Sequence, residues 1–161
     1  MNKLILIIVI ITPFFYDSQC TLKNSVSNYR ANLTSTGNKT LDNFINSEKE
    51  KMEQFFNVKV DLKIASGSNG FAMPSCKNYN CNGTIELGKN LILTELKKSG
   101  PISGNLLGKN MIMAIMAHEF AHIYQYNHPE LGLKYKKGVV WEIHADMLAG
   151  WYMTEYLINK K

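Results

Sequence analysis

The chain has 161 residues, of which 18 are Lys or Arg and 13 are Asp or Glu, so its formal net charge is +5. The basic residues are scattered and do not form a stripe interleaved with aromatic side chains, which argues against a nucleic-acid-binding protein. About 141 residues remain if an N-terminal targeting segment is removed, a normal size for one domain with a hydrophobic core.

Residues 1–20 have the pattern of a signal peptide. Lys3 supplies a positive charge, an apolar run follows from Leu4 to Phe15, and the small residues Ser18 and Cys20 precede a candidate cleavage point after Cys20. The run is short for a membrane span. We therefore expect a secreted or periplasmic protein, which contacts a membrane only if this segment stays uncleaved or if Cys20 is lipidated.

Cleavage after Cys20 leaves two cysteines, Cys76 and Cys81. In an oxidising compartment such a pair favours a disulfide that closes a small loop. Two free thiols or a metal pair are the alternatives, although this spacing is not that of a zinc knuckle.

The remaining chain alternates between helical and extended patterns. Residues 21–40 are rich in Asn, Ser and Thr and predict a flexible lead-in, whereas apolar residues recur at helical spacing from Thr40 to Phe56. Apolar and charged residues alternate over 58–64, the clearest strand pattern in the chain. Residues 65–83 predict a loop, Thr84 to Leu87 a short strand, and residues 91–98 a helix. Two long, mostly apolar helices follow, over 106–126 and 139–158.

This order of elements predicts one small α+β domain over residues 41–161, with a short mixed sheet. The most apolar helix nevertheless carries two histidines and a glutamate, in the segment HEFAH. Burying such groups is unfavourable unless they are paired or bind an ion. His118 and His122 are four residues apart, so both project from one face and can chelate one Zn²⁺, with Glu119 within reach of a metal-bound water.

The second long helix offers the remaining parts of a catalytic zinc site. Glu142 can be the third ligand, and Asp146, one turn later, can accept a hydrogen bond from a ligand histidine. His144 points about 200° away from Glu142 on the same helix and is not expected to bind the same metal.

The segments HEFAHIYQ and EIHADMLAGW resemble the HExxHxxQ and ExxADxxAGxW signatures of neutral zinc metallopeptidases, and the ligand scheme is similar to that of the gluzincins. The resemblance implies a zincin-like fold with an HExxH helix and a second, glutamate-bearing helix. It also implies one Zn²⁺ per chain, held by His118, His122 and Glu142, with Glu119 as general base and Asp146 orienting a histidine. The expected activity is hydrolysis of peptide bonds in a peptide or protein substrate.

Zincins hold the substrate backbone along an edge strand, and the segment before the HEFAH helix is the matching candidate. Its residues are Thr84, Ile85, Glu86 and Leu87. Two other interpretations stay open: a catalytically inactive zincin-like module with a binding or regulatory role, and a membrane-anchored interaction domain. The intact set of ligands and base favours the enzyme.

Overall fold

The computed structural model describes residues 32–33, 35–74, 82–98, 106–132 and 138–159. Its helices and strands confirm the α+β class expected from the sequence. In chain order they are β1 (Asn32–Leu33), α1 (Lys39–Phe56), β2 (Val60–Ala65), β3 (Gly70–Met73), β4 (Gly83–Gly88), α2 (Lys89–Lys98), α3 (Leu106–Asn127), the 3₁₀ turn η1 (Pro129–Leu131) and α4 (Val139–Asn159).

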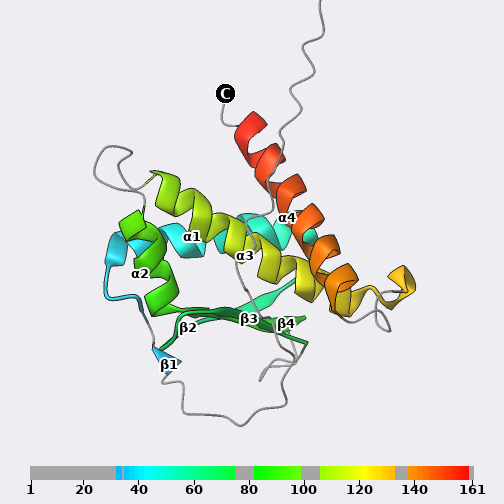
Figure 1. The fold of residues 1–161 in the computed structure, drawn as a ribbon, viewed down its shortest axis with the longest axis horizontal. Coiled ribbons are helices and arrows are strands. Elements are labelled where there is room, and N and C mark those ends of the chain that lie inside the picture. Colours follow the sequence, from blue (N-terminus) through cyan, green and yellow to red (C-terminus); the bar gives the residue numbers. More distant parts are fainter. Residues whose placement is uncertain (1–31, 34, 75–81, 99–105, 133–137, 160–161) are drawn as a thin grey trace, which may run out of the picture.

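The four strands form one mixed sheet in the order β1-β2-β4-β3 (Figure 1). β2 and β4 are parallel, with Leu62 opposite Ile85 and Ile64 opposite Leu87. β1 pairs with β2 and β3 pairs with β4, both antiparallel. Among the described residues, each outer strand pairs with one neighbouring strand, and β3 is the edge strand next to β4.

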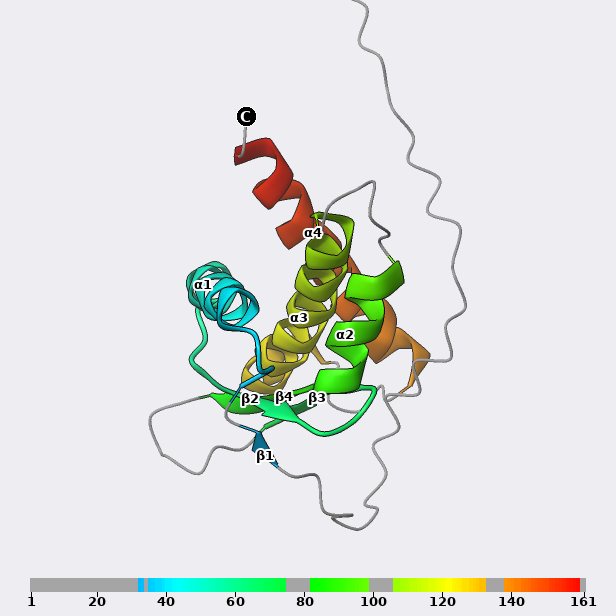
Figure 2. The ribbon, with the colours of Figure 1, turned by 90° about the vertical axis from the view of Figure 1, so that its left-hand side faces the viewer.

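The helices lie on one side of this sheet (Figure 2). α1 and α2 flank α3, and α4 crosses α3 on the side away from the strands. Because α3 has neighbours on several sides, its sequence is apolar around most of its circumference. This burial explains why the helix at the centre of the domain carries apolar residues on almost every side.

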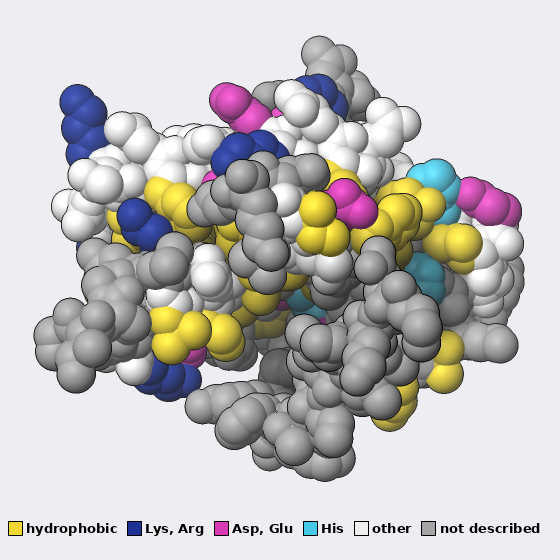
Figure 3. Space-filling model, turned by 90° about the horizontal axis from the view of Figure 1, so that it is seen from above, with side chains coloured by type: hydrophobic (Ala, Val, Ile, Leu, Met, Phe, Trp, Pro, Cys, Tyr) yellow, Lys and Arg dark blue, Asp and Glu magenta, His cyan; other side chains and the backbone are white. Residues whose placement is uncertain are grey.

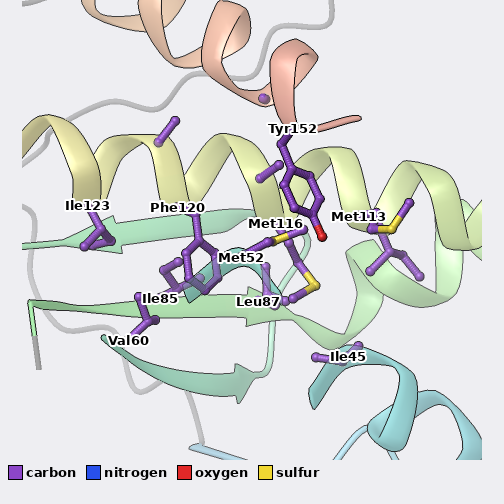
Figure 4. Packing of buried hydrophobic residues seen from close by; sticks show 14 of the residues in the cluster. Ile45, Met52, Val60, Ile85, Leu87, Met113, Met116, Phe120, Ile123 and Tyr152 are labelled. Carbon is purple, nitrogen blue, oxygen red and sulfur yellow. The ribbon is translucent and has the colours of Figure 1, made fainter. Parts of the chain in front are cut away.

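The core fills the space between α3 and the strands (Figure 4). Phe120 and Met116 of α3 are fully buried against the sheet residues Ile85 and Leu87, and α1 contributes Met52. Dense packing of this kind fixes both the height of α3 above the sheet and its rotation about its own axis. The polar face of α3 is thereby held toward α4.

Part of the segment predicted as a flexible lead-in, residues 21–40, belongs to regular elements, because β1 covers Asn32–Leu33 and α1 begins at Lys39. β1 pairs with β2, and Asn38 caps α1 by accepting a hydrogen bond from the backbone N–H of Leu41 at 3.2 Å. Asparagine is a favoured helix N-cap, so the Asn-rich composition here marks a helix start. Residues 21–31 lie outside the described residues.

Candidate metal centre

The second half of α3 carries the two histidines. The side chains of His118 and His122 leave the same face of the helix, and their Nε2 atoms are 3.0 Å apart. The side chain of His122 is 4% exposed, and that of His118 is 20% exposed. One imidazole is thus enclosed by the protein, and the other is partly exposed to solvent.

Glu142 joins them from the first turn of α4. Its Oε2 lies 3.2 Å from Nε2 of His118 and 3.4 Å from Nε2 of His122. Among the residues that the structure describes, these three side chains form a group whose ligand atoms all lie within 4.8 Å of one another. The packing of α4 against α3 therefore brings the third predicted ligand to the two histidines.

The other ring nitrogens have acceptor partners. Nδ1 of His118 is 2.9 Å from Oδ1 of Asp146, and Nδ1 of His122 is 2.7 Å from Oε1 of Gln125. Both partners are oxygen acceptors, so each Nδ1 carries a proton, and each neutral ring then has its lone pair on Nε2. Two lone pairs and a carboxylate oxygen consequently converge, an arrangement that needs a cation, either a proton or a metal ion, between them.

The donor set fits Zn²⁺. Tetrahedral zinc binds imidazole nitrogen and carboxylate oxygen at about 2.0–2.2 Å, which places neighbouring ligand atoms about 3.3 Å apart. The three separations of 3.0, 3.2 and 3.4 Å match that spacing. Three protein ligands with the fourth position left for water are typical of a catalytic zinc site rather than of a structural one.

Glu142 is ionised at neutral pH. Burial alone would raise the pKa of this carboxyl, but in the metal-free site the two imidazoles outweigh it: when His118 and His122 are protonated on Nε2, they donate hydrogen bonds to the carboxylate and attract its charge, which lowers its pKa to about 2. A ligand that is already an anion needs no deprotonation before it binds a cation.

Glu119 lies between the two histidines in the sequence and is 3% exposed. Its Oε2 is buried and receives no hydrogen bond from the described residues. Burial raises the pKa of Glu119; the neighbouring imidazoles act in the opposite direction, and Glu142 raises it further. A buried carboxylate with an unbonded oxygen is unfavourable for stability, which makes a functional role the better explanation.

The strand next to this carboxylate is β3, which corrects one prediction. Thr84 to Leu87 belong to β4, which is hydrogen-bonded to β2 on one side and to β3 on the other, so they are not an edge strand. The edge is β3, and its first residue, Gly70, packs against Glu119. A role for the β4 residues in binding a substrate backbone is therefore excluded by their own strand pairing.

Two further side chains take part in the centre. Asp146 contacts His118 as the sequence suggested, although its own side chain is 72% exposed. Gln125 was not singled out from the sequence, yet it is 3% exposed and contacts both His122 and His144. His144 thus points to Gln125 rather than into the group of three ligands.

A hydrophobic surface borders the centre on α4. Ile143 follows Glu142 and is 52% exposed, and Met147 follows Asp146 and is 68% exposed. Figure 3 shows the molecule from above, with exposed hydrophobic side chains on the face that it presents. A ligand that approaches the histidines along α4 would therefore contact apolar side chains.

Two predicted features lie outside the described residues: the signal peptide over residues 1–20 and the disulfide between Cys76 and Cys81. Within the described residues, none of the helices combines the length and the apolar character that a membrane span requires.

Comparisons with protein-family models, with curated proteins and with solved structures found no match to this chain. The resemblance to zinc metallopeptidases therefore stays a prediction that rests on the two sequence motifs.

Proposed function

We propose that this protein is a zinc-dependent peptidase, in which His118, His122 and Glu142 hold one zinc ion and Glu119 is the general base. The observation that carries the proposal is the convergence of the three acceptor atoms at 3.0–3.4 Å beside a buried glutamate. An arrangement that served only to hold α3 and α4 together would not need a second, unbonded carboxylate next to it.

Zinc held by these residues would polarise a carbonyl group and acidify a water molecule. Glu119 would accept the proton of that water on Oε2, the oxygen that receives no hydrogen bond from the described residues. It would then donate the same proton to the leaving amine. Burial raises the pKa of Glu119, which makes its carboxylate a better proton acceptor.

The substrate would be an extended peptide lying along β3. The outer side of this edge strand can add one more strand through backbone hydrogen bonds, which hold a main chain with little preference for its side chains. Gly70 would bring the backbone of the strand close to Glu119. We further propose a secreted or periplasmic location, based on the pattern of residues 1–20.

The test compares wild type, Glu119→Gln and Glu142→Ala after reconstitution with zinc. Zinc is counted by mass spectrometry, and cleavage is followed on a mixture of unstructured peptides. We expect one zinc per chain in the wild type and in Glu119→Gln, and much weaker binding in Glu142→Ala. Only the wild type should cleave peptides.

A wild type that takes up no zinc would overturn the proposal as a whole. A wild type that binds zinc but cleaves no better than Glu119→Gln would overturn the enzymatic part, and would assign the site to a non-catalytic module instead.

A further inference from the structure

Gln125 uses its side-chain amide on three partners at once. Oε1 lies 2.7 Å from Nδ1 of His122, while Nε2 lies 2.8 Å from the backbone carbonyl of Trp141 and 3.0 Å from Nδ1 of His144. A primary amide has two N–H donors and one carbonyl acceptor. Both donors and the acceptor are therefore engaged, inside a side chain that is only 3% exposed.

The carbonyl of Trp141 decides which way the amide points. A backbone carbonyl can only accept, so the group that faces it must be the NH₂ of Gln125. The opposite orientation would place two oxygens against each other at 2.8 Å. The oxygen of the amide is thus directed to His122, whose Nδ1 must carry the proton, and the lone pair of the neutral ring falls on Nε2.

The same amide holds α4 on both sides of Glu142. Trp141 precedes the glutamate and His144 follows it by two residues, and Gln125 bonds to both. The indole of Trp141 also stacks on the His122 ring, with 8° between the planes. One residue of α3 consequently positions one imidazole and the backbone that carries the carboxylate.

The two histidines differ in how firmly they are held. Asp146 bonds to His118 from a side chain that is 72% exposed, so water can replace that contact. Water cannot replace the enclosed Gln125 in the same way. If Gln125 were lost, the buried Nδ1–H of His122 would have no acceptor.

We propose that Gln125 is the positioning residue of this metal site. It holds His122 in the Nδ1–H tautomer and fixes Glu142 relative to α3, and its loss weakens metal binding more than loss of Asp146. The inference rests on the proposed zinc site, but not on peptidase activity.

The first measurement is zinc affinity by competition with a chelator, for Gln125→Met, Gln125→Glu, Asp146→Ala and Gln54→Met. Partners of ligand histidines typically contribute 10–100-fold in affinity, so we expect a loss of that size in Gln125→Met and a smaller loss in Asp146→Ala. Gln125→Glu keeps the acceptor for His122 but cannot donate to Trp141, and should fall between wild type and Gln125→Met. Gln54 is exposed on α1 and serves as the matched control, which we expect to bind as wild type does.

The second measurement uses the metal-free protein at a pH where its imidazoles are neutral. Nitrogen chemical shifts of the His122 ring report the tautomer, which we expect to be Nδ1–H in the wild type and a mixture in Gln125→Met. A purely structural role would lower stability without changing the tautomer. Gln125→Met with wild-type zinc affinity or an unchanged tautomer would overturn the inference, whereas a wild type that binds no zinc would overturn the proposed function and leave the tautomer measurement to decide about Gln125.

Discussion

A Cβ atom on Gly70 would lie 2.7 Å from Oε1 of Glu119 and 3.2 Å from its Cδ. Carbon and oxygen atoms that are not bonded to each other do not approach to the shorter distance without strain. The edge strand can therefore lie against the buried carboxylate only because residue 70 has no side chain. This contact links the sheet to the proposed general base.

Gly70→Ala should displace Glu119 without touching the three metal ligands. We expect cleavage of peptides to fall by about 100-fold, the effect of moving a reacting group by roughly 1 Å, while zinc content stays at one per chain. The measurement is kcat on a fluorogenic peptide, with zinc counted on the same sample.

Gly150→Ala is the matched control for this substitution. Gly150 is exposed on α4, and a Cβ there would have nothing within 4 Å. Alanine favours a helix over glycine, so this variant should keep its activity and gain up to about 1 kcal/mol of stability. Full activity in Gly70→Ala would contradict the importance of the contact with Glu119.

Removal of zinc should lower the melting temperature. The three ligands come from two helices, so a bound ion stabilises the packing of α4 on α3, by about 2.7 kcal/mol when free zinc is 100 times its Kd. Thermal unfolding with zinc and with excess chelator measures this difference. Glu142→Ala should melt at nearly the same temperature in both conditions; a shift as large as that of the wild type would mean that zinc binds elsewhere.

Asp42 should make stability depend on pH in the acid range. Burial alone would raise the pKa of this carboxyl, but hydrogen bonds from Ser35 and Thr36 outweigh it and hold the pKa below its usual 3.8. Because the folded pKa is lowered, the contribution of Asp42 is present above pH 3.8 and is lost as the pH falls through the folded value. Urea unfolding of Asp42→Asn should show a loss of about 1 kcal/mol at pH 7 and a smaller loss at pH 2. An equal loss at both pH values would show that the charge is unimportant.

The buried carboxylate of Glu48 makes stability depend on one hydroxyl group, that of Tyr152. The hydroxyl of Tyr152 donates to Oε2 of Glu48 at 3.2 Å, and Lys51 bonds to the other oxygen at 2.8 Å. Burial raises the pKa of Tyr152, so the hydroxyl keeps its proton and remains a donor. Tyr152→Phe should therefore lower the free energy of unfolding by about 1–3 kcal/mol without changing zinc content.

Tyr124→Phe tests whether that loss is specific. The ring of Tyr124 stacks on His128 at a centroid distance of 4.0 Å, a contact that phenylalanine keeps. Its change in stability should stay within about 0.5 kcal/mol. Equal losses in the two variants would argue against a special role for the bond between Tyr152 and Glu48.

The features that the sequence predicted are those that local periodicity determines. The long helices α3 and α4 follow from apolar residues at helical spacing, and the placement of His118 and His122 follows from their separation by one turn. The meeting of Glu142 with this pair depends on helix packing. It could be anticipated only because a catalytic zinc needs a third ligand.

The missed features depend on contacts between distant segments. β1 has two residues and β3 has four, too few to show alternation, and β3 lies in a segment rich in Gly, Ser and Asn that reads as a loop. Pairing with β4 is what makes β3 a strand, and that pairing also removes β4 from the edge. Gln125 is the last residue of the HEFAHIYQ motif, but its contacts with Trp141 and His144 depend on how α4 packs against α3.

The unequal exposure of the two imidazoles would set an order for capture and release of a metal ion at the proposed site. Glu142 and His118 face solvent, whereas His122 is covered by Gln125 and the stacked indole of Trp141. An incoming ion would exchange its first waters for the outer pair and reach the inner nitrogen last. Dissociation would run in reverse, so we expect the exposed contact between His118 and Asp146 to govern the rate of exchange at the proposed site, and the enclosed contacts of His122 to govern the affinity.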